Sequence, residues 1–270
     1  MKSYLKGVIV DWAGTIVDYG SRAPVEAFRA AFAHEGVEIS IAEARAPMGL
    51  AKRDHIRAVI EMARVTTAWR ERHGGKAPGE DEIERIYQRF LPLQLPVLTQ
   101  LSTVIPGALD AFAAFRGRGL KIGSTTGYVR ELMDVLLPHA EKQGLYVDSM
   151  VCPSDVAVGR PAPYMCFLNA MKLNVFPMWE LMKIGDTPAD VEEGRNAGMW
   201  TIGVTRQGNE VGLSPEEQAA LPPPELHARM TFARERLSRA DYLVESIAET
   251  PAVLDEIAAR LAGGERPPIK

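Results

Sequence analysis

Short apolar runs alternate with helical patterns along most of this chain. Val8–Val10 is a β-branched run, typical of a strand that is buried on both faces. Similar runs recur beyond Pro106-Gly107, each followed by a helical pattern, and predict strands at residues 120–125, 149–152, 182–185, 200–204 and 242–244. Repeated strand–helix units of this kind predict an α/β fold with a Rossmann-like, doubly wound parallel sheet.

Residues 21–100 interrupt this alternation, because every segment in that stretch has a helical pattern. One helix is expected to run from Gly49 to about Arg64. Pro92 and Pro96 are expected to divide the last helical segment, since proline lacks the backbone N–H donor of a helix interior. The position of this stretch, between the first strand and the rest of the sheet, predicts an inserted helical cap.

The chain is therefore expected to have three parts. Residues 1–20 and 101–262 form the α/β core, residues 21–100 form the cap, and residues 263–270 form a flexible tail.

Composition limits the classes of function. A chain of 270 residues with 46% apolar residues can bury a full core. A net charge of −4 argues against a dedicated nucleic-acid or anionic-membrane binder. The only cysteines, Cys152 and Cys166, are too few for a disulfide framework and indicate a reducing compartment. No apolar run reaches transmembrane length, and Met1–Lys6 leads directly into the first strand, so we expect a cytoplasmic protein without a signal peptide.

Polar side chains that suit phosphate chemistry follow the predicted strands. Asp11 ends the first strand, and a carboxylate there faces the crevice in which open α/β sheets bind ligands. Thr126 and Gly127 follow the second strand, where a hydroxyl and a backbone amide at a helix N-terminus suit a phosphate oxygen. Ser124 and Thr125 are alternatives to Thr126.

A cation and two further carboxylates complete this set. Arg160 lies in Gly159–Pro163, where two prolines stiffen the loop, and its planar guanidinium can pair with phosphoryl and carboxylate oxygens. Asp186 and Asp190 follow another strand at a spacing of four residues. Together with a carbonyl oxygen and waters, such a pair suits octahedral Mg²⁺.

A lysine of the predicted cap is placed unusually. Lys52 lies on the same helix face as the apolar residues Ile56 and Val59, with Met48 one turn before it and His55 three residues after it. An amine on an apolar face is desolvated, which favours its neutral form. The neutral amine is the form that attacks carbonyl carbons.

These segments resemble the motifs of the haloacid dehalogenase superfamily. Asp11–Thr15 resembles its first motif, usually Asp-x-Asp-Gly-Thr, and the other three motifs are matched by Thr126, by Arg160 and by the pair Asp186 and Asp190. The resemblance implies a Rossmann-like core with a cap inserted after the first strand. It implies that Asp11 attacks phosphorus and that Asp11, the Ala13 carbonyl and Asp186 bind Mg²⁺, with Asp190 acting through water.

One departure from the first motif points to a particular branch. The superfamily's second Asp, which protonates a leaving oxygen, is Ala13 in this chain. Asp-Trp-Ala-Gly-Thr resembles the phosphonoacetaldehyde hydrolases (phosphonatases), as does Pro-Met-Gly-Leu-x-Lys-x-x-His at residues 47–55. This resemblance implies hydrolysis of the phosphorus–carbon bond of phosphonoacetaldehyde to acetaldehyde and phosphate, with a Schiff base at Lys52 and an aspartyl phosphate at Asp11.

The two unusual features explain one another chemically. A carbanion is a very poor leaving group, and an acid at position 13 would help it little. An iminium formed by Lys52 can accept the electron pair. Met48 and Gly49 fall within the motif and are expected to contact substrate, and His55 or Tyr128 could act as acid or base.

Other implications are structural. Ser21 departs from the branch, many members of which have Cys there, and Trp12 is expected in the core. The resemblance further implies a homodimer joined through the caps, acting on a small-molecule phosphonate.

Two alternative functions are considered. One is a phosphatase or phosphomutase acting on an ester, which Ala13 disfavours, and the other is an inactive relative that binds a phosphorylated ligand.

Overall fold

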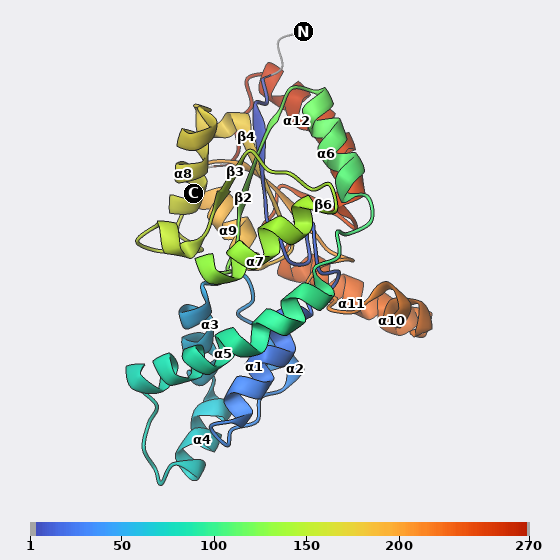
Figure 1. The fold of residues 1–270 in the computed structure, drawn as a ribbon. Coiled ribbons are helices and arrows are strands. Elements are labelled where there is room, and N and C mark those ends of the chain that lie inside the picture. Colours follow the sequence, from blue (N-terminus) through green and yellow to red (C-terminus); the bar gives the residue numbers. More distant parts are fainter. Residues whose placement is uncertain (1–3, 269–270) are drawn as a thin grey trace.

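A parallel sheet forms the centre of the fold. The computed structural model describes residues 4–268, and in this range six strands pair in the order β3-β2-β1-β4-β5-β6 (Figure 1). Every neighbouring pair is parallel. The strands are β1 (Gly7–Val10), β2 (Lys121–Thr125), β3 (Ser149–Val151), β4 (Leu181–Gly185), β5 (Trp200–Val204) and β6 (Tyr242–Val244). The predicted Rossmann-like sheet is confirmed.

Helices cover both faces of the sheet, which is why its strands are apolar on both sides. Within β1, Val8 and Val10 pack into the larger hydrophobic cluster, and Ile9 packs into a smaller cluster on the opposite face. The first cluster includes residues of α6 (Ala108–Gly117), α7 (Arg130–Glu141) and α12 (Thr250–Ala262). The opposite face is covered by α8 (Tyr164–Leu173) and α9 (Pro188–Asn196).

A group of helices lies beyond the carboxyl ends of the strands (Figure 1, blue to teal). It consists of α1 (Ala23–Ala33), α2 (Ile41–Arg45), α3 (Lys52–Ile60), α4 (Ala63–Arg72) and α5 (Glu80–Leu101). Buried aromatic side chains join these helices, and Phe28 of α1 stacks on Phe90 of α5 with ring centroids 4.2 Å apart. The helical character predicted for residues 21–100 is thus present, and the group stands at the ligand-binding edge of the sheet.

Two predictions within this group are wrong. The helix expected from Gly49 to about Arg64 begins at Lys52 and ends at Ile60, and Met62 has extended backbone angles before α4 begins. The helical spacing of apolar residues continues across this break, and no Gly or Pro marks it. The sequence pattern therefore does not indicate where α3 ends. Pro92 and Pro96 do not divide α5. Both are on its exposed face, where solvent can satisfy the carbonyl groups that proline leaves without a donor.

Five further elements complete the part of the fold that the structure describes. They are α10 (Pro215–Ala220), α11 (Pro223–Arg236) and short 3₁₀ helices at Pro153–Asp155, Met178–Glu180 and Ile247–Glu249. In the expected tail, residues 265–268 have no regular secondary structure, although the Arg266 guanidinium lies 5.0 Å from the Trp179 ring centroid. Residues 1–3, where no signal peptide was expected, and residues 269–270 of the tail lie outside the described range. Among described helices, none combines the length and apolar character needed to cross a membrane.

Candidate active site

A cavity lies between the strand ends and the cap helices. It contains about 280 Å³ of space not filled by atoms, a volume that includes space open to solvent. Most of the residues singled out in the sequence line it: Asp11, Ala13, Met48, Gly49, Lys52, Thr126, Gly127, Tyr128 and Arg160. Ser21, the departure from the resemblance, also lines it. Trp12 is fully buried in the core, as expected.

Three buried carboxylates meet behind this cavity. Asp11, Asp186 and Asp190 each offer an oxygen, and these oxygens lie within 4.8 Å of one another. Burial, with the nearby charge of Asp190, raises the pKa of Asp11 to about 6. Burial and the charges of Asp11 and Asp190 raise the pKa of Asp186 well above its ordinary value. A divalent cation would offset this repulsion, and an all-oxygen donor set suits Mg²⁺.

Asp190 differs from the other two carboxylates because protein cations surround it. Its Oδ1 lies 2.8 Å from Lys183 Nζ and 2.9 Å from Arg160 Nη1. Its Oδ2 accepts a hydrogen bond from the Thr187 hydroxyl at 2.6 Å, in the capping box of α9. Although burial opposes them, Arg160 and Lys183 hold the pKa of Asp190 below its ordinary range. These contacts fit a supporting position better than that of a direct metal ligand.

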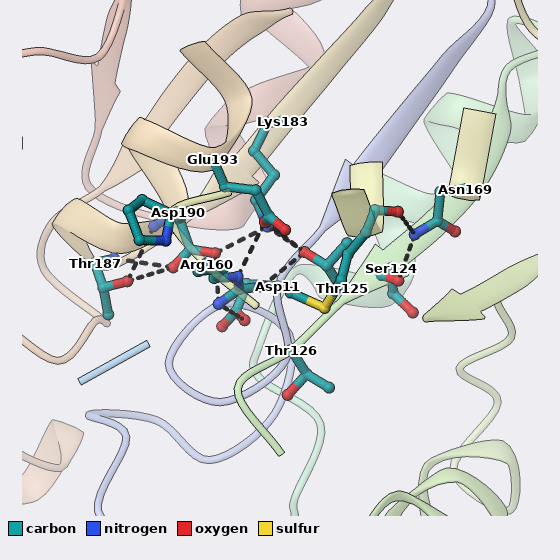
Figure 2. Close-up of polar contacts among 12 residues, drawn as sticks. Asp11, Ser124, Thr125, Thr126, Arg160, Asn169, Lys183, Thr187, Asp190 and Glu193 are labelled. Atoms are coloured by element: carbon teal, nitrogen blue, oxygen red, sulfur yellow. Dashed lines mark hydrogen bonds and ion pairs between the residues drawn. The ribbon is translucent and has the colours of Figure 1, made fainter. Parts of the chain in front are cut away.

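Arg160 brings the nucleophile candidate and this supporting layer together (Figure 2). Its Nη1 lies 2.8 Å from Asp11 Oδ1. Its Nε donates to Glu193 Oε2 at 2.9 Å, and its Nη2 donates to the Thr125 hydroxyl at 2.7 Å. The guanidinium is therefore held on three sides beside Asp11.

Lys52 enters the cavity from the cap. Its side chain is buried, and the rings of Tyr128, Phe28 and Phe90 surround Nζ with centroids 4.7, 5.4 and 5.8 Å away. Burial lowers the pKa of Lys52 to about 7 from 10.5, while the charge of Asp11 opposes this shift. Lys52 is also the first residue of α3, where the helix dipole disfavours a cation. A substantial fraction of this amine is neutral near pH 7.

The two acid–base candidates have different positions. Tyr128 lines the cavity, and burial together with neighbouring carboxylates raises its pKa well above 10, so it remains a phenol that can donate a proton. His55 is buried behind Lys52, with Nε2 3.0 Å from the Ala44 carbonyl oxygen and its ring stacked on Phe28. Burial and the charge of Lys52 lower the pKa of His55 well below 6.5. Of the two, Tyr128 has the more direct access to a ligand.

Cap and core approach closely at two glycines. A Cβ atom at Gly127 would lie 2.6 Å from the Leu50 carbonyl oxygen, and one at Gly49 would lie 2.3 Å from the Thr187 hydroxyl oxygen. Gly49 also has φ of +92°, which other residues rarely adopt. The backbone that leads to Lys52 therefore rests directly on the core.

Sequence reasoning missed Lys183 and Glu193, which belong to the polar cluster around Arg160. Thr125, considered as an alternative phosphate ligand, donates to Glu193 Oε2 at 2.8 Å and accepts from Lys183 Nζ at 2.7 Å, whereas Thr126 lines the cavity. Ser124 contacts the Ser149 carbonyl oxygen at 3.4 Å. The sequence did offer a signal for Lys183, because a lysine inside a strand that is predicted to be buried needs a polar partner. No sequence pattern indicated a role for Glu193.

Comparisons with known proteins agree with this geometry. Residues 5–198 match the family model of haloacid dehalogenase-like hydrolases. The chain is 47% identical to a phosphonoacetaldehyde hydrolase of Syntrophobacter fumaroxidans, over 97% of this chain and 95% of the relative. It is 45% identical to one of Paraburkholderia xenovorans, over 98% of this chain and 99% of the relative.

Solved structures place the chain in the same group. A phosphonoacetaldehyde hydrolase-like protein from Oleispira antarctica has a TM-score of 0.94 and 40% identity, over 97% of this chain and 96% of that one. A β-phosphoglucomutase from Clostridium difficile, at 16% identity and a TM-score of 0.70 over 96% of this chain and 99% of that one, shares the fold. The chain belongs to the haloacid dehalogenase-like hydrolases, and within them to the phosphonoacetaldehyde hydrolases.

Proposed function

We propose that this protein hydrolyses the phosphorus–carbon bond of phosphonoacetaldehyde to acetaldehyde and phosphate. One observation carries the proposal: the buried Lys52 amine and the Asp11 carboxylate line the same cavity, and Ala13 stands where an ester phosphatase needs its general acid. The activity named for the curated relatives supports it.

The first chemical step belongs to Lys52. Its neutral amine adds to the aldehyde carbon, and loss of water gives an imine. We assign to Tyr128, whose ring centroid is 4.7 Å from Lys52 Nζ, the donation of the proton that the departing hydroxyl needs. Protonation of the imine nitrogen then gives an iminium, whose carbon is bonded to the carbon atom that carries phosphorus.

The second step belongs to Asp11. Its carboxylate attacks phosphorus while Arg160, Thr126 and Gly127 bind the phosphoryl oxygens. The phosphorus–carbon bond breaks, and its electron pair moves into the iminium to give an enamine on Lys52. Water hydrolyses the aspartyl phosphate to phosphate, and proton addition and hydrolysis of the enamine release acetaldehyde and the free amine. The carbon takes its proton after departure, so position 13 needs no acid.

Mg²⁺ fits the carboxylates described above. Asp11, Asp186 and the Ala13 carbonyl would hold it, with Asp190 supporting the site, and the ion would offset the charge of the phosphoryl group and the carboxylates. Since Asp186 also accepts hydrogen bonds from Asn209 N–H at 2.8 Å and from the Thr15 hydroxyl at 3.3 Å, its orientation is fixed before a cation binds.

The two parts of the chain supply different catalytic residues. We propose that residues 21–100 act as a cap on a core of residues 1–20 and 101–262, because the cap supplies Lys52 and the core supplies Asp11. From the family resemblance we also propose a homodimer joined through the caps, for which light scattering is the test, and a cytoplasmic location.

Product analysis tests the function. The purified protein should release phosphate and acetaldehyde in equal amounts from phosphonoacetaldehyde, and chelation of divalent cations should stop the reaction. An ester phosphatase would instead prefer p-nitrophenyl phosphate, and an inactive binding protein would release nothing from either compound. Either result would overturn the proposal.

A further inference from the structure

Three buried side chains that do not line the cavity form one polar cluster with the Arg160 guanidinium, and two of them, Thr125 and Glu193, contact it directly. Thr125 of β2, Lys183 of β4 and Glu193 of α9, here called the Arg160 support cluster, come from three separate elements (Figure 2). None is more than 1% exposed. Glu193 Oε2 accepts from Arg160 Nε at 2.9 Å and from the Thr125 hydroxyl at 2.8 Å, and lies 3.1 Å from Lys183 Nζ.

The cluster contacts two of the three guanidinium nitrogens. Nε bonds to Glu193 and Nη2 bonds to Thr125. The third nitrogen, Nη1, pairs with Asp11 Oδ1 at 2.8 Å and with Asp190 Oδ1 at 2.9 Å. Because Asp11 lines the cavity, Nη1 is the guanidinium nitrogen beside the carboxylate that a phosphoryl group would approach.

The free-energy cost of burying the charged groups of this cluster indicates that the cluster does more than stabilise the fold. Taking ions out of water is expensive, and apolar residues of similar size often stabilise a core as well or better. A free arginine side chain, however, has many rotamers, and ordering it when substrate binds would weaken binding. A guanidinium fixed beforehand avoids that loss.

We propose that Glu193, together with Lys183 and Thr125, is a positioning residue for phosphoryl transfer. The cluster fixes the Arg160 guanidinium so that Nη1 faces both the Asp11 carboxylate and the phosphoryl oxygens. This inference rests on the proposed function, since it needs a phosphoryl group at Asp11. It assigns these residues no contact with substrate.

Glu193→Gln tests the role, with Glu35→Gln as the matched control. Glu35 is also a buried glutamate, paired with Arg85 at 2.7 Å, but it lies in the turn after α1, within the stretch proposed as the cap. Three quantities are measured: kcat/KM for phosphonoacetaldehyde, the inhibition constant of inorganic phosphate, and imine formation, trapped by borohydride with acetaldehyde. The final amount of trapped label per chain also measures the fraction of the enzyme that is folded.

For Glu193→Gln we expect kcat/KM to fall roughly 100-fold and the phosphate inhibition constant to rise about tenfold. Imine trapping should stay at the wild-type rate, because it needs Lys52 and an aldehyde but no phosphoryl group. Glu35→Gln should change none of the three once corrected for folded enzyme. Unchanged phosphate inhibition in Glu193→Gln, or loss of trapping in parallel with kcat/KM, would overturn the positioning role.

A second pair of variants keeps the test decisive if Glu193→Gln does not fold. Thr125→Val keeps the shape but removes the hydroxyl, and should weaken phosphate binding as Glu193→Gln does. Thr125→Ser restores the hydroxyl and should recover most of the loss. Phosphate inhibition unchanged in Thr125→Val would contradict the role. Failure of wild-type enzyme to form an imine or to release phosphate would instead contradict the proposed function itself.

Discussion

The charge of Lys52 is set by effects that oppose one another. Burial lowers its pKa to about 7 and Arg160 adds to this, whereas the Asp11 carboxylate favours the ammonium. Three aromatic rings also favour the cation, although weakly. Since desolvation prevails, the amine loses its proton at a lower pH than an exposed lysine does.

Imine formation should therefore depend on pH in a defined direction. Only the neutral amine reacts, so borohydride trapping with acetaldehyde should be half-maximal near pH 7 and fall about tenfold per unit below it. The label should be on the peptide that carries Lys52. Lys52→Arg keeps the charge but should trap nothing, since a guanidinium stays protonated. A midpoint near pH 10, or a label on another lysine, would contradict this mechanism.

Ala13 is the residue that separates this site from an ester phosphatase. Ala13→Asp should not accelerate the phosphonate reaction, because the leaving group is carbon, and it should slow it by adding a fourth carboxylate to the buried acidic group. A restored general acid should give weak hydrolysis of p-nitrophenyl phosphate. Comparing kcat/KM of wild type and variant on both compounds checks this. A variant that is faster on phosphonoacetaldehyde would show that the role of position 13 is misunderstood.

At the scale of elements, the contact between cap and core depends on two glycines. The loop before α3 rests on the loop after β2, with the Leu50 carbonyl oxygen facing Gly127. This contact closes the cavity over Lys52, so the lowered pKa of Lys52 is a property of the docked elements as well as of one residue.

Gly127→Ala should separate the two elements. Its Cβ would lie 2.6 Å from the Leu50 oxygen, too close for either backbone to remain in place. Water should then reach Lys52 and its pKa should rise, because desolvation is the main cause of the shift. We expect the midpoint of the trapping profile to move upward by about one pH unit or more, with a lower kcat/KM. An unchanged midpoint with lower activity would mean that Gly127 acts only by binding phosphate.

The elements could be predicted from sequence where one local signal determines them. The strand ends at Val10, Thr125 and Gly185 could be predicted, because polar residues follow each of the three strands. The end of α3 could not be predicted, because no Gly or Pro marks the break at Met62. Continuity of α5 also depends on context, since its prolines are tolerated only on the exposed face.

At the scale of the whole molecule, the site combines segments that are far apart in the sequence. The parallel sheet brings Asp11, Arg160 and Asp186 to one edge, and a resemblance of motifs was enough to group them. Lys183 and Glu193 belong to no such motif. Glu193 contacts Arg160, and Lys183 contacts Glu193. These contacts come from the register of β4 beside β1 and from the placement of α9, neither of which a local pattern contains.

Metal binding and folding stability should be linked through pH. The pKa of folded Asp11, about 6, exceeds its ordinary 3.8, and the pKa of Asp186 is also raised. The stability that Asp11 contributes without metal is therefore fully present below about pH 4 and is lost as pH rises through about 6, and the raised pKa of Asp186 acts in the same direction. Mg²⁺ needs the ionised carboxylates, so its stabilising effect should increase over the same range.

The rise in Tm on adding Mg²⁺ should accordingly be larger at pH 8 than at pH 5. At a hundredfold excess over Kd, ligand binding adds about 2.7 kcal/mol to the free energy of unfolding. Asp186→Asn should abolish this rise and the activity, yet raise the Tm of the metal-free protein at pH 8, because it removes a like charge beside Asp11 and Asp190. Thermal unfolding of both proteins with Mg²⁺ and with a chelator, at both pH values, checks this. Equal Mg²⁺ effects at pH 5 and pH 8, or a variant that still responds to Mg²⁺, would show that these carboxylates do not bind the ion.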